Sequence, residues 1–220
     1  MSFGFVAYND SGTYQADDTY ANYAITSSGT GTFATDYSFA NTIVSCTITV
    51  TGVAPLIAYS CGSRMSQMTV SNSGSTWSFY MTSKVAANGS TFSYWIFDKA
   101  DQATPSGTMG LEVFNASGVR VFHSHTKVLR VAGIGAGTYT AGRTYATIQL
   151  TLGMAYNETD ISGVGTNYRI NLSFSGSSVS SNVVTLGTSV YENYTTTSIT
   201  GDTYSNATAG LYIVIDVTNY

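Results

Sequence analysis

The sequence repeats itself, and this repeat constrains the fold more than any other feature. Residues 4–12, Gly-Phe-Val-Ala-Tyr-Asn-Asp-Ser-Gly, return as residues 110–118, Gly-Leu-Glu-Val-Phe-Asn-Ala-Ser-Gly. The register continues beyond these segments, so that Gly29 recurs as Gly135. Such self-similarity predicts an internal duplication, in which two copies of one small unit follow each other along the chain.

The length and the repeat together predict the domain organisation. A chain of 220 residues can form one large β domain or two domains of about 100 residues, and the repeat favours two. We therefore expect an all-β protein made of two tandem β-sandwich domains related by internal duplication. They would cover residues 1–103 and 109–220, with a linker at residues 104–108 that contains Pro105.

The pattern of apolar residues supports the all-β expectation. Apolar and polar residues alternate with period two, and no window shows the 3.6-residue period of an amphipathic helix. The longest β-branched and apolar runs, at residues 42–50 and 147–152, predict central strands. Each copy closes with an apolar strand that ends in Asp, at residues 92–98 and 211–216.

Each copy also carries the same predicted turn near its start. Asn9 and Gly12 form the turn motif of the first copy, and Asn115 and Gly118 form that of the second. Asn hydrogen-bonds readily to nearby backbone, and Gly tolerates positive φ. Backbone geometry alone therefore explains why these residues persist in both copies.

The charge content excludes some classes of partner. Only 9% of the residues are charged, and the net charge is −4, so the sequence offers no basic stripe for phosphates and we expect no nucleic-acid partner. No apolar run approaches the roughly 20 residues needed to cross a bilayer, so we expect no membrane partner. The first residues lack the pattern of a secretory signal. We therefore expect that the protein is made in a cytoplasm and that, if it acts outside a cell, it leaves by lysis or by a dedicated route.

The sequence offers few residues for catalysis or metal binding. Cys46 and Cys61 are the only cysteines; a buried thiol is the favoured interpretation of Cys46, and a bridge between the two stays open. His123 and His125 alternate on a predicted strand and could bind a divalent metal, but a solvated loop or a partner contact is favoured because no further ligand is indicated. We expect no catalytic residues, no metal and no cofactor.

The 17 tyrosines suggest a contact surface. Most are expected to be structural, because Tyr favours strands and core edges. Four in the second copy fall in or near predicted loops and are candidates for stacking on sugar rings or for packing against neighbouring subunits: Tyr156, Tyr191, Tyr194 and Tyr204.

The second hairpin segment resembles a family of viral proteins. Residues 110–122, Gly-Leu-Glu-Val-Phe-Asn-Ala-Ser-Gly-Val-Arg-Val-Phe, with residues 128–131, are similar to the opening of small tailed-phage virion or tail-associated proteins, which often begin Met-x-x-Gly-Leu-x-Val-Phe-Asn-x-x-Gly. The resemblance is weaker near the start of the chain, where Phe5 replaces Leu and Tyr8 replaces Phe. It implies a structural component of a tail or fibre, and it brings no catalytic residues.

Three functions compete on this basis. The first is a virion structural protein, with other virion proteins and further copies of itself as partners and the virion as its location; low charge and tandem β units favour it. The second is a carbohydrate-binding, receptor-binding module that contacts a host surface glycan, and a capsid decoration protein is a related alternative. A hydrolase is least favoured, because it requires a cleft with convergent carboxylates that the sequence does not indicate.

Overall fold

The computed structural model describes most of the chain: residues 6–8, 14–17, 22–37, 43–84, 86–107, 109–162, 167–197, 205–206 and 210–220. Nearly all regular structure in these residues is antiparallel β-sheet, and the one helical element among them is a 3₁₀ turn, η1 (Ala100–Gln102). The all-β prediction is confirmed. A search of the described residues for a helix long and apolar enough to cross a membrane finds none.

The strands form three larger sheets and two separate hairpins. In spatial order, the six-stranded sheet contains β12 (Val131–Ile134), β19 (Tyr212–Asp216), β14 (Tyr145–Gln149), β6 (Leu56–Ser60), β9 (Thr91–Lys99) and β3 (Tyr23–Thr32). The four-stranded sheet contains β4 (Ala34–Asp36), β5 (Ile43–Thr51), β8 (Thr76–Ser83) and β7 (Ser66–Ser73). The five-stranded sheet contains β13 (Gly137–Thr138), β17 (Val183–Thr196), β16 (Tyr168–Ser180), β15 (Met154–Asp160) and β18 (Ser205–Asn206). The hairpins are β1 (Val6–Tyr8) with β2 (Tyr14–Asp17), and β10 (Glu112–Phe114) with β11 (Arg120–His123).

The six-stranded sheet is shared by the two halves of the chain. Strands β3, β9 and β6 come from before the expected linker, and β14, β19 and β12 come from after it. The halves meet where β6 pairs with β14, with Tyr59 opposite Thr147. The order of strands is mirrored about this junction, as expected if each half contributed an equivalent three-strand unit; the duplication itself stays a prediction.

Two further sheets cover one face of the shared sheet and build sandwich-like cores. In the first half, Phe79 and Met81 of β8 pack with Ile57 and Ile96 of the shared sheet. In the second half, one small cluster joins the shared sheet to β16 and β17: Tyr145, Val179, Val184 and Val214. These side chains lie at alternate positions that face the interior, because successive strand residues point to opposite faces.

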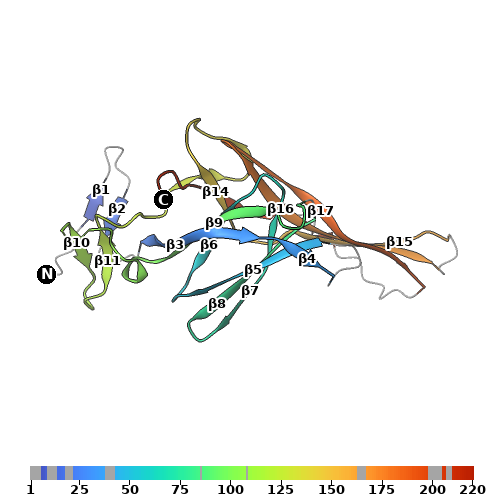
Figure 1. Cartoon of the computed structure of the whole chain (residues 1–220), viewed down its shortest axis with the longest axis horizontal. Coiled ribbons are helices and arrows are strands. Elements are labelled where there is room, and N and C mark those ends of the chain that lie inside the picture. Colours follow the sequence, from blue (N-terminus) through green and yellow to red (C-terminus); the bar gives the residue numbers. More distant parts are fainter. Residues whose placement is uncertain are drawn as a thin grey trace.

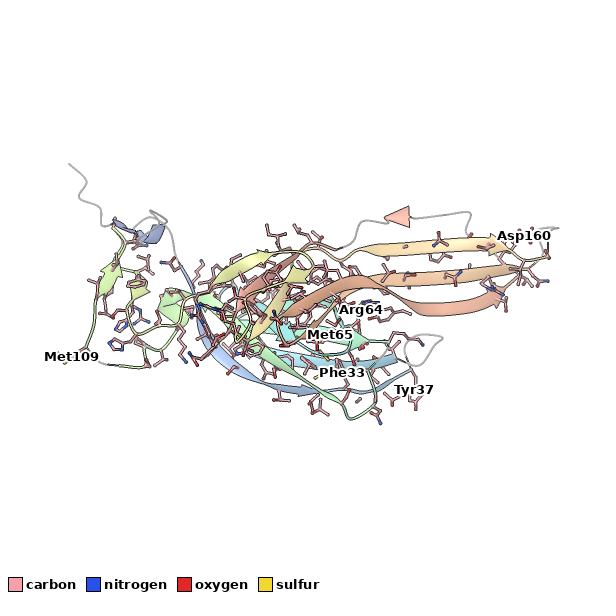
Figure 2. The ribbon with its side chains drawn as sticks, turned by 90° about the horizontal axis from the view of Figure 1, so that it is seen from above. Phe33, Tyr37, Arg64, Met65, Met109 and Asp160 are labelled. Atoms are coloured by element: carbon pink, nitrogen blue, oxygen red, sulfur yellow. The ribbon has the colours of Figure 1, made fainter. Side chains whose placement is uncertain are left out.

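The molecule is elongated, with different structures at its two ends (Figure 1). The hairpins β1–β2 and β10–β11 lie beside each other at one end, near Met109 in Figure 2. Strands β15, β16 and β17 extend together to the other end, near Asp160. The segment expected as a linker leads from η1 to the β10–β11 hairpin, and the chain then returns to the shared sheet.

Backbone contacts between the covering sheets also link the two halves. Met65 and Ser177 exchange two N–H to O hydrogen bonds of 2.9 Å, and the Val179 N–H donates to the carbonyl of Cys61 at 2.8 Å. The Ser66 hydroxyl donates to the carbonyl of Ser175 at 2.5 Å. Because both partners in these contacts are fixed in strands or in tight turns, the halves form one hydrogen-bonded body.

Candidate functional site

The two described tyrosines among the predicted contact residues have different surroundings. Tyr191 is 1% exposed, packs edge-on against Phe174 and accepts a hydrogen bond from Thr82 at 3.2 Å. Its ring therefore belongs to the core and offers no face to a sugar. Tyr156, on β15, is half-buried and donates to Glu158 at 2.6 Å. Tyr204 and the side chain of Tyr194 lie outside the described residues.

The turn motif of the second copy joins β10 to β11. The Asn115 side-chain oxygen accepts from the Ser117 and Val119 N–H groups at 3.0 and 2.9 Å. Gly118 has a φ of +75°, a conformation that favours glycine. Asn9 and Gly12, the equivalent residues of the first copy, lie outside the described residues.

The histidine pair does not form a metal site with other described residues. The Nδ1 atom of His123 accepts the backbone N–H of His125 at 2.9 Å, so this nitrogen is occupied. The Nε2 atom lies 3.6 Å from Glu112, and the ring is buried. Among the residues the structure describes, no three His, Cys, Asp or Glu side chains gather as metal ligands. His123 instead secures the end of the β10–β11 hairpin.

Both cysteines are free thiols. Cys61 is buried, and Cys46 packs against the same core cluster from a partly buried position. Burial raises the pKa of each thiol, which favours the protonated form. The favoured interpretation of Cys46 as a small hydrophobic residue agrees with this packing.

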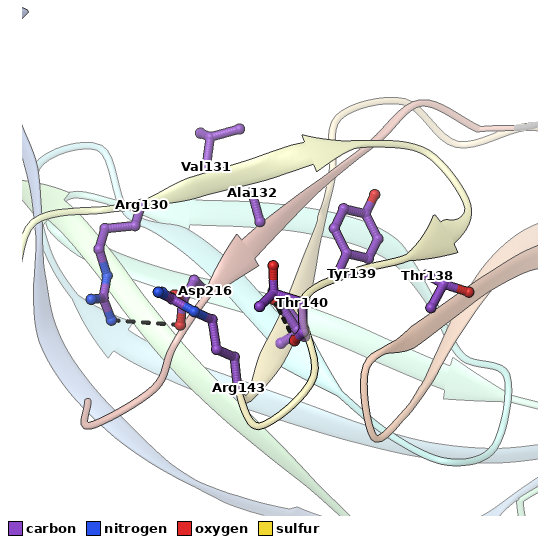
Figure 3. A pocket seen from close by; sticks show the side chains of 9 residues that line it. Arg130, Val131, Ala132, Thr138, Tyr139, Thr140, Arg143 and Asp216 are labelled. Atoms are coloured by element: carbon purple, nitrogen blue, oxygen red, sulfur yellow. Dashed lines mark hydrogen bonds and ion pairs between the residues drawn. The ribbon is translucent and has the colours of Figure 1, made fainter. Parts of the chain in front are cut away.

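The structure reveals a basic groove that the sequence analysis did not single out. It consists of three hollows, the largest of about 500 Å³, which share lining residues. Arg130 lines the first and second hollows, and Lys127 and Tyr220 line the second and third. Figure 3 shows the first hollow, with Arg130, Arg143 and Asp216 toward one side and Thr138 and Tyr139 toward the other.

The charged side chains of the groove are held by specific contacts. Arg143 forms an ion pair with Asp216, and Arg130 lies 3.6 Å from the other oxygen of the same carboxylate. Burial alone would raise the pKa of Asp216, but hydrogen bonds from Thr218 together with Arg143 and Arg130 outweigh it and lower that pKa. The carboxylate therefore stays ionised and fixes both guanidinium groups.

The C-terminal tyrosine organises the second part of the groove. The Tyr220 ring lies 4.7 Å from the Arg130 guanidinium and 5.8 Å from the Lys127 ammonium, both within the range of cation–π attraction. Its hydroxyl donates to the carbonyl of Val128. Lys127 and Arg130 thus stand beside one anchored ring.

One sequence signal for this groove was available. Three of the eight Lys and Arg residues of the chain fall within residues 127–143, although the chain as a whole is acidic. Asp216, the fourth charged residue of the groove, lies at the end of β19. Its closeness to Arg130 and Arg143 depends on β19 pairing with both β12 and β14, which sequence spacing does not reveal.

A second surface feature lies at the hairpin end of the molecule. Val113 and Val121 of the β10–β11 hairpin are buried, whereas four large apolar side chains in and around the same hairpin are exposed: Met109 (83%), Leu111 (51%), Phe114 (50%) and Val119 (42%). We call these four residues the hairpin patch.

Comparison with known proteins adds no relative. Neither a scan against models of protein families nor searches of curated proteins and of solved structures match this chain.

Proposed function

We propose that this chain is a structural component of a tailed bacteriophage particle, in the tail or its fibres, and that it acts without catalysis. The hairpin patch carries the proposal. Exposed apolar side chains concentrated in one hairpin are typical of surfaces that bind another protein. The hairpin that bears them is also the segment that resembles tail-associated phage proteins.

The shape of the molecule is consistent with this role. The hairpin patch lies at one end of an elongated body, and β15 to β17 reach the other end (Figure 2). A body of this form can dock by one end and expose the other. The shared sheet and the hydrogen bonds between Met65 and Ser177 join the two halves of that body.

The first test is the size of the protein in solution and its presence in particles. Light scattering on the purified chain is expected to show a discrete oligomer, and electron cryomicroscopy of particles of the virus that carries the gene is expected to show its density in the tail. Density on the capsid surface would favour the decoration alternative. A monomer that is absent from particles would contradict the proposal.

Variants of the hairpin patch test the surface itself. Leu111→Ser combined with Phe114→Ser should weaken association or incorporation at least tenfold, because burying two such side chains contributes about 3 kcal/mol or more. Val70→Ser, at an exposed apolar residue on β7, is the matched control and should have no effect. Circular dichroism should show both proteins folded.

The carbohydrate-binding alternative rests on a separate observation, the basic groove. Its largest hollow, of about 500 Å³, has the size of a small ligand site and combines charged groups with an aromatic ring. A virion component that also contacts a host glycan would use the hairpin patch for the particle and the basic groove for the glycan.

A further inference from the structure

We propose that the basic groove binds a saccharide that carries carboxylate groups. The inference deepens the glycan-binding alternative and rests on the groove itself. Its test uses the purified protein without a particle. Failure of this test leaves the virion proposal standing, and absence of the protein from particles leaves the groove proposal standing.

The charge of the groove selects an anion. Lys127, Arg130 and Arg143 line its hollows, and Asp216 is the one acidic residue among the lining residues. Both oxygens of that carboxylate are occupied, one by the Thr218 N–H and the other by Arg143. The groove therefore keeps positive charge on a protein whose net charge is −4.

The cations are accessible as well as held in place. The side chains of Arg130 and Arg143 are 44% and 51% exposed, so each can offer further N–H groups to a ligand. Arg130 also donates to the carbonyl of Thr218 at 2.7 Å, which fixes its orientation. A guanidinium fixed in this way binds a carboxylate with little additional loss of side-chain freedom.

The opposite side of the first hollow suits a sugar ring. The Tyr139 hydroxyl donates to the carbonyl of Gly135 at 3.0 Å, and its ring packs against Tyr145 with centroids 5.3 Å apart. The exposed hydroxyls of Thr138 and Thr140 lie beside it and make no hydrogen bond with other described residues. An anchored aromatic ring next to unpaired hydroxyls provides both an apolar face and polar partners for sugar hydroxyls.

The row of neighbouring hollows favours an oligomer over a single sugar. The first hollow, of about 500 Å³, shares Arg130 with the second as a lining residue, and the second shares Lys127 and Tyr220 with the third. Cations thus recur along the groove. A chain of acidic sugars, which presents carboxylates at regular intervals, matches that arrangement.

The experiment measures binding of defined oligosaccharides by calorimetry at low salt. The probes are oligomers of galacturonic acid, mannuronic acid and sialic acid, with the methyl ester of the galacturonate oligomer as the uncharged counterpart. Polyglutamate of equal charge tests for an acidic protein partner. At least one acidic oligomer should bind, the ester should bind at least tenfold more weakly, and higher salt should weaken binding.

Two groove variants and one control locate the site. Arg143→Gln and Lys127→Gln should each weaken binding of the acidic oligomer about tenfold, since each removes one charge-assisted hydrogen bond. Arg169→Gln removes the same charge from an exposed position on β16 and should leave binding unchanged. If Arg143→Gln unfolds the protein, Lys127→Gln alone decides, because the partners of the Lys127 ammonium among the described residues are the Tyr220 ring and the carbonyl of Asn219.

Four results would overturn the proposal. They are no binding of any acidic oligomer at millimolar concentration, equal binding of the methyl ester, polyglutamate binding as tight as that of the sugars, and equal losses in the groove variants and in Arg169→Gln.

Discussion

The side chain of Gln149 pairs with the backbone of Gln67 as a neighbouring strand would. The Gln67 N–H donates to the Gln149 side-chain oxygen at 3.0 Å, and the Gln149 side-chain amide donates to the Gln67 carbonyl at 3.1 Å. The same oxygen accepts from the hydroxyls of Tyr59 and Tyr212 at 3.2 and 2.9 Å. Burial raises the pKa of Tyr212 to about 12, so its hydroxyl stays protonated and can donate. One buried amide thus joins the two halves of the chain.

Replacing this amide should destabilise the whole fold. Gln149→Leu takes this side-chain partner away from the Gln67 backbone groups and from two tyrosine hydroxyls, which should lower the free energy of unfolding by about 3 kcal/mol. Urea denaturation measures the loss. Gln67→Ala is the control: only the backbone of Gln67 takes part, so this change should cost less than about 1 kcal/mol. Equal losses in the two variants would contradict the pairing.

Two glycines of the long β16–β17 hairpin should differ in their tolerance of a methyl group. They are register partners, and both lie under the segment around Arg64. A Cβ at Gly176 would lie 2.7 Å from the Met65 carbonyl oxygen, which is fixed by its hydrogen bond with Ser177. A Cβ at Gly187 would lie 2.7 Å from the Arg64 guanidinium, which is the far end of a flexible side chain and can move. Gly176→Ala should cost about 2 kcal/mol and Gly187→Ala less than about 1 kcal/mol.

A double-mutant cycle distinguishes these two causes. Arg64→Ala should remove the cost of Gly187→Ala but only part of the cost of Gly176→Ala, because a Cβ at Gly176 meets the Met65 carbonyl oxygen as well as the Arg64 side chain. Gly62→Ala, where no atom lies within 4 Å of the added methyl, should be neutral. Thermal unfolding of the single and double variants gives the comparison, and full rescue of Gly176→Ala by Arg64→Ala would argue against a backbone clash.

The ion pairs of Asp216 should make stability depend on pH. The pKa of Asp216 in the folded chain lies below its ordinary value of 3.8, so the folded state binds the proton more weakly than the unfolded state. The stabilisation is complete above pH 3.8 and is lost as the pH falls through the lower, folded pKa. Asp216→Asn should therefore be less stable than the natural chain at pH 7, and the difference should shrink below pH 3.8. Urea titrations at several pH values test this, and a difference that grows toward acid would contradict it.

The turn of the β10–β11 hairpin should depend on the positive φ of Gly118 and on the side chain of Asn115. Gly118→Ala places a Cβ at a φ of +75° and should cost about 1 kcal/mol. Asn115→Ala removes the acceptor for two backbone N–H groups and should cost a similar amount. Ser117→Ala, which keeps the backbone contact, is the control. Hydrogen exchange at the Val119 amide reports the local opening, and unchanged protection in Asn115→Ala would show that its side chain is dispensable.

Local sequence features predicted the local structure well. Alternation of apolar and polar residues predicted an all-β protein, because the side-chain period of a strand is visible in any short window. Asn115 and Gly118 identified a turn for the same reason: its geometry depends on residues only a few positions apart. Two apolar runs predicted central strands, and β5 and β14 lie within or close to them.

Contacts between segments far apart in the sequence were harder to predict from the sequence. The Tyr191 hypothesis concerned a loop residue, but Tyr191 lies at the register shift between β16 and β17, and its ring packs in the core against Phe174. The basic groove was missed because Asp216 is separated from Arg130 and Arg143 by most of the second half of the chain. Only the pairing of β19 with β12 and β14 brings these charges together.

The sequence by itself determined that the chain forms antiparallel strands, where a tight turn lies, and that the surface carries few charges, since these properties depend on composition and near neighbours. The tertiary structure decided that the two halves share one sheet, that Gln149 joins them, and that three cations and a carboxylate line one groove. Those features depend on strand pairing between distant segments, and many pairings satisfy the same alternating pattern until packing and buried hydrogen bonds select one.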